Sequence, residues 1–200
     1  MSELERKKED AIWIAKTLFE RGRATGSSAN LSFLHEGHIY ITGSGTCFGR
    51  LTKDSFSKVA MDGAHVEGLK PSKELPLHKM YYEKSDQIQA VIHVHSFYAV
   101  MYSFLKQECV TDMVPAYTPY LRMKVGTIGL VPYAEPGSQE LFGYFKEAVS
   151  KSDGFILKQH GPVIGGQSLM DAFYGLEELE ESCRIAWTLD EGRRERVDSL

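Results

Sequence analysis

The segment AVIHVHSFYAV, residues 90–100, contains two histidines within an apolar run. Its first half is rich in β-branched residues and predicts a strand, whereas residues 96–105 predict a helix. Side chains two positions apart on a strand point to the same face, so His93 and His95 would lie side by side. Most of what the sequence indicates about function depends on the role of these two histidines.

Helical and strand patterns alternate along the rest of the chain. Apolar residues at helical spacing predict helices over 4–21, 75–85, 136–152 and 168–190. Short apolar runs bounded by turn residues predict strands within 31–45, 126–133 and 154–166. No repeat or linker interrupts the pattern, so we expect one domain over residues 1–200, with helices on both faces of a single sheet.

The composition argues against a nucleic-acid-binding or membrane-binding protein. The formal net charge is -4 and no block of Lys or Arg stands out, whereas either partner would favour a basic surface. Cys47, Cys109 and Cys183 are widely spaced and favour a reducing compartment. No apolar run reaches the roughly 20 residues that a membrane helix needs, and no signal-peptide pattern is present. We therefore expect a cytoplasmic protein.

The two histidines of the opening segment suit a metal site, for which a third ligand is needed. Two imidazoles on one strand face can reach one ion, although a local hydrogen-bonding role on a half-exposed face is an alternative. His160 is the candidate third ligand, because it ends an apolar strand where the chain breaks at Gly-Pro. His35, His38 and His65 fall in polar turns, and His78 falls in a helix, where we expect it to be exposed or partly buried.

Residues 70–74, with the sequence KPSKE, supply a candidate carboxylate and an anion-binding segment. Ser72 and Lys73 could hold an anion, and Glu74 could act as a metal ligand or a general base. Alternatively, Glu74 could serve only to compensate the partial positive charge at the N-terminus of the following helix. The small-residue loops ATGSSANLS (24–32) and ITGSGTCFGR (41–50) could bind phosphate through backbone N–H groups, but neither matches a P-loop or dinucleotide-binding motif.

Five motifs in a fixed order resemble the class II aldolase/adducin family over about residues 8–187. They are GSSANLS (26–32), TGSG (42–45), KPSKE (70–74), HVH (93–95) and QHGPV (159–163). The resemblance implies a three-layer αβα sandwich of the α/β class with a central, mainly antiparallel or mixed sheet. It also implies a homotetramer with active sites at subunit interfaces and a divalent metal ion, usually Zn²⁺.

The resemblance also assigns roles to individual residues. His93, His95 and His160 match the metal-binding histidines. Glu74 matches the carboxylate that serves as fourth ligand and proton-transfer group. Positions that contact phosphate fall on Asn30, Ser44, Gly45 and Ser72, with Ser27 or Ser28 as a further contact. Gly43 departs from the family pattern, which usually has Pro at this position.

Within the family, the chain looks most like the branch that decarboxylates 3-oxo-tetronate 4-phosphates. The likeness is carried by GRLTKDSFSKV (49–59), KPSKELPLH (70–78), VPAYTPYLRMKVG (114–126) and VPYAEPGSQEL (131–141). Lys73 replaces a second serine of the sugar-phosphate aldolases and would orient the phosphate or the carboxylate. Tyr120 is a candidate proton donor to a neighbouring subunit's site. The alternatives are an aldolase or epimerase acting on fuculose or ribulose phosphates, and a non-catalytic interaction module like the adducin head.

Overall fold

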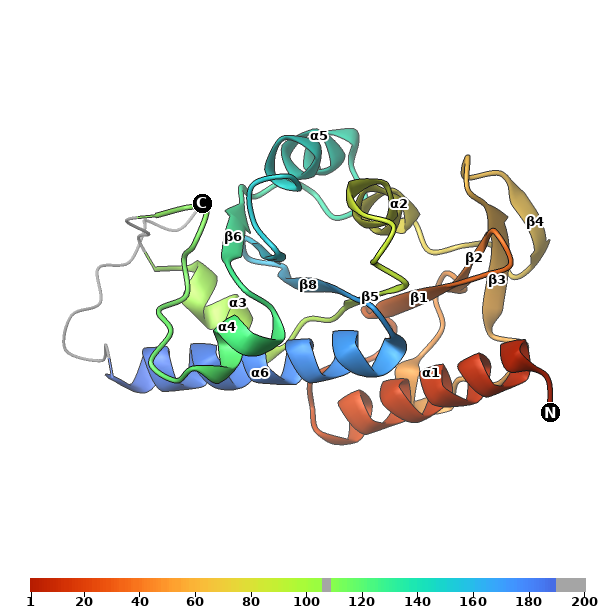
Figure 1. The fold of residues 1–200 in the computed structure, drawn as a ribbon, viewed down its shortest axis with the longest axis horizontal. Helices are drawn as coiled ribbons and strands as arrows, with labels where there is room; N and C mark the ends of the chain where they lie inside the picture. Colours follow the sequence, from red (N-terminus) through yellow and green to blue (C-terminus); the bar gives the residue numbers. More distant parts are fainter. Residues whose placement is uncertain (106–108, 190–200) are drawn as a thin grey trace. The chain divides into compact units, whose positions relative to one another are not determined.

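The computed structural model describes residues 1–105 and 109–189, which form a mixed α/β structure (Figure 1). Its eight-stranded sheet has the order β4-β3-β2-β1-β5-β8-β7-β6. Strands β6 and β7 pair in parallel, whereas β1 pairs antiparallel with both of its neighbours. The chain divides into two compact units, the first made of residues 1–94 and 165–173 and the second of the remainder.

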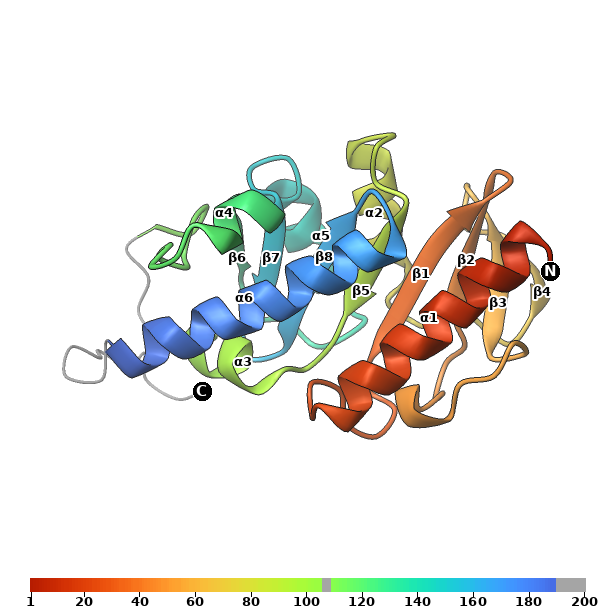
Figure 2. The same ribbon diagram turned by 60° about the horizontal axis from the view of Figure 1, so that its bottom comes forward.

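The first unit has five strands with one helix on each face. Its strands are β1 (Asn30–His35), β2 (His38–Thr42), β3 (Phe56–Ala60), β4 (His65–Gly68) and β5 (Ala90–His93). Its helices are α1 (Glu3–Glu20), the 3-10 helix η1 (Phe48–Arg50) and α2 (Leu75–Lys84). Figures 1 and 2 show α1 and α2 on opposite sides of the strands. Strand β1 therefore presents alternate side chains to two different helices.

Local sequence explains the elements that frame this unit. Ser2 and Glu5 form a reciprocal capping box at the start of α1, and Ala11, Ile14 and Leu18 form part of its buried stripe. The turn between β1 and β2 has positive φ at both Glu36 and Gly37, as a tight two-residue hairpin requires.

The two faces of β1 differ in polarity. On the face toward α1, Leu31 and Phe33 are buried, and Phe33 stacks on Tyr40, whose ring lies near the Lys8 ammonium of α1. The opposite face carries Asn30 and Ser32, which are buried polar residues. Polar side chains buried against α2 need hydrogen-bond partners, and these partners define the site described below.

The second unit also has helices on both faces of its strands (Figures 1 and 2). It contains α3 (Phe97–Ser103), α4 (Tyr120–Lys124), β6 (Ile128–Val131), α5 (Gln139–Ala148), β7 (Gly154–Leu157), most of β8 (Gly161–Gly166) and most of α6 (Leu169–Leu189). Ser138 caps α5 by accepting a hydrogen bond from the Leu141 N–H, and Phe145 of this helix packs edge-on against Phe155 of β7.

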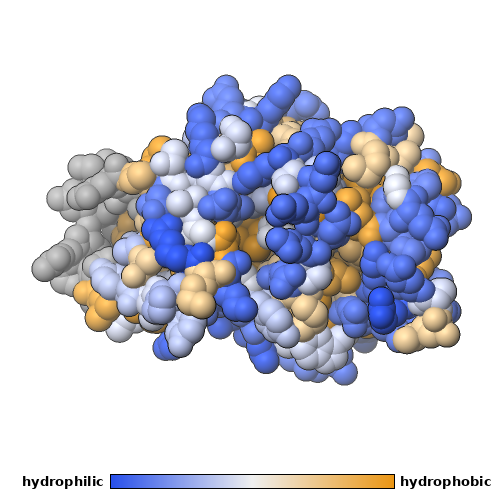
Figure 3. All heavy atoms as spheres, in the orientation of Figure 1, coloured by the Kyte–Doolittle hydropathy of each residue, from blue (hydrophilic) through white to orange (hydrophobic). Residues whose placement is uncertain are grey.

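The face of the molecule drawn in Figure 3 is largely hydrophilic, and hydrophobic residues show between the polar ones. No helix within residues 1–105 and 109–189 has both the length and the apolar character that a membrane crossing would need.

The α/β class and the sheet covered on both faces agree with the sequence prediction, but several details around the candidate histidines differ. Strand β5 ends at His93, so His95 lies beyond the strand. The break between β7 and β8 falls at residues 158–160 rather than at His160-Gly161-Pro162. The three histidines expected in polar turns all lie at strand ends, since His35 ends β1, His38 begins β2 and His65 begins β4. The single domain over 1–200 stays a prediction. The last ten residues, 191–200, are rich in Arg and Glu, which favours a solvated end, and they lie outside the described residues.

Candidate metal centre

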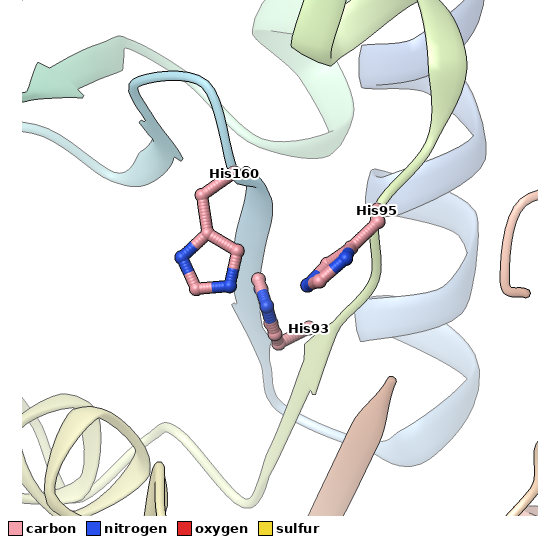
Figure 4. Close-up of side chains that lie close together, drawn as sticks. All are labelled: His93, His95 and His160. Carbon is pink, nitrogen blue, oxygen red and sulfur yellow. The ribbon is translucent and has the colours of Figure 1, made fainter. Parts of the chain in front are cut away.

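His93, His95 and His160 converge, as Figure 4 shows. One ligand nitrogen of each imidazole can be chosen such that all three lie within 4.8 Å of one another. His93 is fully buried, His160 is 6% exposed and His95 is half-buried. The rings of His95 and His160 meet edge to face with their centroids 4.7 Å apart. The three histidines singled out in the sequence therefore form one cluster.

Backbone geometry on both sides of the cluster holds the imidazoles in place. His93 is the last residue of β5, so its side chain has a strand-defined direction. Gln159, directly before His160, adopts a left-handed conformation with φ 59°, which is uncommon for a residue other than Gly. The Gln159 N–H donates to the Ser103 Oγ at 2.9 Å, and the His160 N–H donates to the Leu157 carbonyl. These hydrogen bonds fix the turn that presents His160.

The donor set fits a divalent transition metal. Two nitrogens bound to one tetrahedral ion at about 2.0–2.1 Å lie about 3.4 Å apart, and the three nitrogens within 4.8 Å of one another are near this separation. Three imidazoles are ligands that zinc and similar ions accept, and they leave further coordination positions for a substrate. The cluster can therefore hold a divalent ion while keeping an open position.

Glu74 lies against this cluster through His93. Its Oε2 atom is 3.4 Å from the His93 Nε2, which is the separation expected for two ligands of one ion. Glu74 is 3% exposed, and although it occupies the N-cap position of α2 it makes no side-chain capping hydrogen bond. Its Oε2 instead accepts a hydrogen bond of 2.8 Å from the Asn30 Nδ2. The carboxyl group is directed into the protein rather than toward the helix end.

A continuous chain of hydrogen bonds extends from Glu74 into the interior of the first unit. The Asn30 Oδ1 lies 2.6 Å from the His78 Nε2, and the His78 Nδ1 lies 2.7 Å from the Ser32 Oγ. The Ser32 Oγ lies 2.6 Å from the Tyr82 hydroxyl. We call these five residues, Glu74, Asn30, His78, Ser32 and Tyr82, the α2–β1 network. All of them are buried.

His78 corrects an expectation drawn from the sequence. It is fully buried rather than exposed or partly buried. Burial lowers the pKa of the His78 imidazole to about 4, although the negative charge of Glu74 acts in the opposite direction. Burial likewise raises the pKa of the Tyr82 phenol. The signal that could have identified His78 is its spacing four residues after Glu74, which places both on one helix face.

Glu180 is a second functional candidate that the sequence did not reveal. It belongs to α6 and is 1% exposed, and it accepts hydrogen bonds from the Ser96 Oγ at 2.7 Å and from the Tyr98 and Ala99 N–H groups at 3.0 and 2.9 Å. These donors follow His95 directly and form the start of α3. Glu180 thus anchors the segment that carries one imidazole. Its run LEELEES resembles a solvated helix face, so no pattern pointed to it.

The two loops expected to bind phosphate lie next to each other in the first unit. Gly43 and Pro71 form an isolated bridge, the Ser44 N–H donates to the Lys70 carbonyl at 2.8 Å, and the Ser72 N–H donates to the Thr42 carbonyl at 3.3 Å. Ser44 and Gly45 are exposed, and Gly45 has a positive φ of 77°. This arrangement supports a common anion-binding role, which stays a prediction.

Gly43 has a structural reason to differ from the Pro that is usual in the family. Its N–H donates to the Ser55 carbonyl at 2.8 Å, and proline has no such donor. A Cβ atom at this position would also lie 2.6 Å from the Leu69 Cδ1. The loop is therefore built for glycine.

The remaining predicted residues lie on the surface. Ser27 is exposed in the loop before β1, and the neighbouring Ser28 uses its hydroxyl to bond the Thr25 carbonyl. Lys73 is exposed directly before Glu74. Tyr120 begins α4 and is 56% exposed, as a residue serving a neighbouring subunit would be. The roles of these residues stay predictions.

A cavity of about 380 Å³ in the second unit, lined by residues that include Tyr133, Tyr144, Lys151 and Lys158, contains none of the candidate residues. We therefore place the chemistry at the histidines rather than in this cavity.

Comparisons with known proteins agree with the motif-based resemblance. The family model for the class II aldolase and adducin N-terminal domain matches residues 9–187. A 3-oxo-tetronate 4-phosphate decarboxylase of Escherichia coli K12 is 38% identical over 183 residues, covering 91% of this chain and 86% of the relative. An L-fuculose phosphate aldolase of Methanocaldococcus jannaschii is 34% identical over 178 residues, covering 89% of this chain and 94% of the relative.

Solved structures give the same result for the fold. YgbL of Escherichia coli, described as an aldolase, epimerase or decarboxylase, superposes with a TM-score of 0.91 at 34% identity, covering 99% of this chain and 96% of that one. An L-fuculose 1-phosphate aldolase superposes with a TM-score of 0.82 at 28% identity, covering 100% and 92% of the two chains.

We predict that Glu180→Ala lowers the free energy of unfolding by on the order of 3 kcal/mol, because the Ser96 hydroxyl and two backbone N–H groups lose their acceptor. Urea unfolding measures the change. Glu181→Ala on the same helix removes an exposed pair with Arg184 and should change stability by less than about 1 kcal/mol. Equal losses in the two variants would contradict the anchoring role.

We predict that the burial of neutral His78 makes the free energy of unfolding fall as the pH is lowered. Since its pKa is about 4 in the folded protein and 6.5 in its ordinary state, the unfolded chain binds the proton first as pH falls. The neutral, buried His78 therefore makes its full contribution to the free energy of unfolding above pH 6.5. As the pH falls from 6.5 to 4, this free energy decreases by up to about 3 kcal/mol. Urea unfolding of the wild type and of His78→Gln at several pH values isolates the contribution of His78. An unchanged difference between the two proteins across this range would refute the prediction.

Proposed function

Because the chain belongs to the class II aldolase and adducin family, we propose that it is a metal-dependent carbon–carbon lyase that decarboxylates a 3-oxo-tetronate 4-phosphate. The products would be dihydroxyacetone phosphate and carbon dioxide. The observation that carries the proposal is the approach of Glu74 to His93, at 3.4 Å, beside the three-histidine cluster in a chain 38% identical to such a decarboxylase.

The reaction needs stabilisation of negative charge and one proton. When the bond between the carboxylate carbon and carbon 2 breaks, its electron pair delocalises toward the ketone at carbon 3 and gives an enediolate. Protonation at carbon 2 then completes dihydroxyacetone phosphate. A divalent ion, Zn²⁺ in our proposal, would supply Lewis-acid stabilisation of this charge. His93, His95 and His160 would hold the ion.

Glu74 is our main candidate for proton transfer. Its carboxyl group is buried, lies beside His93 and is held by the Asn30 amide, so its position is defined before substrate binds. A fixed general acid or base at hydrogen-bonding distance typically contributes 10²–10⁴-fold to rate. Tyr120 is the second candidate, from a neighbouring subunit of a homotetramer.

The substrate phosphate would lie at the loops around Ser44, Gly45 and Ser72, with Ser27 as a further contact. The adjacency of these loops supports a shared anion site. Lys73 would meet the phosphate or the carboxylate. Asn30 was assigned to phosphate by resemblance, but both ends of its amide are engaged by Glu74 and His78, which favours a role in holding Glu74. The three cysteines are widely spaced and form no CxxC motif, which favours a reducing compartment. They therefore support a cytoplasmic location.

Two alternative functions can be distinguished from the proposed decarboxylase. The similarity to fuculose-phosphate aldolases supports an aldolase, because breaking a carbon–carbon bond to an aldehyde gives the same kind of enediolate. A non-catalytic module like the adducin head would have no chemical need for three converging histidines and a buried carboxyl group.

We predict carbon dioxide release from 3-oxo-tetronate 4-phosphate and at least tenfold less aldehyde release from fuculose 1-phosphate, measured as kcat/KM on the same preparation. This ratio corresponds to about 1.4 kcal/mol of transition-state discrimination. A reversed substrate ratio would make the aldolase correct.

We also predict that the protein contains about one divalent ion per chain, and that chelation or the double change His93→Ala with His95→Ala abolishes activity. Metal-free protein with full activity would overturn both enzymatic proposals.

We predict that Glu74→Gln lowers kcat by about 10²–10⁴-fold, because the amide cannot exchange the proton. Glu83→Gln, at an exposed position on the same helix, is the matched control and should retain wild-type kinetics. Steady-state assays of carbon dioxide release compare the two. Equal activity of Glu74→Gln and wild type would leave Tyr120 as the proton donor.

A further inference from the structure

We propose that His78 is a positioning residue, which acts through Asn30 to fix the direction of the Glu74 carboxyl group. This inference rests on the proposed role of Glu74 and adds a residue that does not itself contact substrate or metal. The observation behind it is that the α2–β1 network contains one consistent arrangement of donors and acceptors.

The orientation of the Asn30 amide is the first step. Its Nδ2 faces the Glu74 Oε2 at 2.8 Å and its Oδ1 faces the His78 Nε2 at 2.6 Å. If the amide were reversed, its oxygen would face a carboxylate oxygen and two acceptors would be in contact. The Glu74 carboxylate therefore requires the amide nitrogen on its side, and the amide oxygen on the side of His78.

The tautomer of His78 follows from this orientation. The Asn30 Oδ1 can only accept, so the His78 Nε2 must carry a hydrogen and donate. A neutral imidazole then has an acceptor at Nδ1, and the Ser32 hydroxyl donates to it at 2.7 Å. Because the Ser32 hydrogen is used in this bond, the Tyr82 hydroxyl must donate to the Ser32 Oγ at 2.6 Å. All four bonds run in one direction, from Tyr82 to Glu74.

Burial makes this arrangement specific. Ser32 and His78 have no exposed surface, and Tyr82 and Asn30 are each 5% exposed, so water cannot readily replace a lost partner. Reversing the His78 tautomer would place two acceptors, Nε2 and the Asn30 oxygen, against each other, or would turn the amide away from Glu74. The network therefore couples the protonation pattern of one buried ring to the position of the reacting carboxyl group.

The spacing of the residues explains how the network can form. Glu74, His78 and Tyr82 are four residues apart and form one stripe on α2, with a rise of about 6 Å per step. Asn30 and Ser32 are two apart on β1, with a rise of about 6.8 Å. The two steps nearly match, so helix and strand groups alternate along the interface.

Two substitutions at position 78 separate positioning from packing. In His78→Gln the amide nitrogen can replace the Nε2 donor to Asn30, whereas in His78→Asn the shorter side chain can replace the Nδ1 acceptor but leaves the Asn30 oxygen without its donor. We expect His78→Gln to keep kcat within about fivefold of wild type, and His78→Asn to lower kcat by about 10²-fold, with KM changing less. Leu77→Ala, a buried change on the same helix outside the network, should lower Tm without lowering kcat of the folded protein.

The second measurement does not depend on activity. Nitrogen-15 NMR of the histidine rings in the metal-free and zinc-loaded protein should show His78 neutral, with its hydrogen on Nε2, from about pH 5.5 to 8. A hydrogen on Nδ1, or a charged ring, would overturn the proposal. Equal kcat losses in His78→Gln and His78→Asn, matched by Leu77→Ala, would show that His78 only packs, and would also overturn it.

The outcomes also separate this proposal from the proposed function. If wild-type protein releases no carbon dioxide from 3-oxo-tetronate 4-phosphate while the NMR spectra show the Nε2–H tautomer, the decarboxylase assignment fails and the orientation of Glu74 by His78 is retained. The kinetic comparison would then be made with fuculose 1-phosphate. An increase in KM alone for His78→Asn would instead indicate that Asn30 binds phosphate, and the positioning role would be wrong.

Discussion

Hydrogen bonds between buried polar groups are the constraint on which the arrangement of the first unit depends. Helix α2 packs on a face of β1 that carries Asn30 and Ser32, where an ordinary core would be apolar. Each of these groups would cost about 1–3 kcal/mol if it were buried without a partner. The helix therefore has to sit where His78 and Tyr82 meet them, and Glu74 is carried into position by the same docking.

The register of the sheet then brings the carboxyl group to the histidines. Asn30 of β1 lies opposite His93 of β5 in the antiparallel ladder, so both side chains point to the face covered by α2. A shift by one residue would turn Asn30 and His93 to opposite faces and separate Glu74 from His93. The site is thus specified by strand pairing as much as by the identity of its residues.

Much of this organisation could be predicted from residue patterns, and the reasons for the failures are physical. The histidine pair, His160 and Glu74 could be singled out because candidate metal ligands and strand ends leave local signatures, and the structure brings these residues close together. Their role as metal ligands stays a prediction. His95 lies past the end of β5, so its convergence with His93 depends on the irregular segment between β5 and α3, which periodicity does not describe. His78 and Glu180 were missed because their burial is set by elements distant in sequence, such as β1 for His78 and the start of α3 for Glu180.

The anchoring of α3 by Glu180 has a consequence for how the chain tolerates change. A carboxyl group on α6 holds the backbone immediately after His95, more than 80 residues away in sequence, through three short hydrogen bonds. Helix α6 therefore fixes the backbone beside His95, a candidate metal ligand, although the two lie far apart in sequence. A change at Glu180 would therefore disturb the backbone beside His95, although Glu180 is not itself one of the candidate ligands.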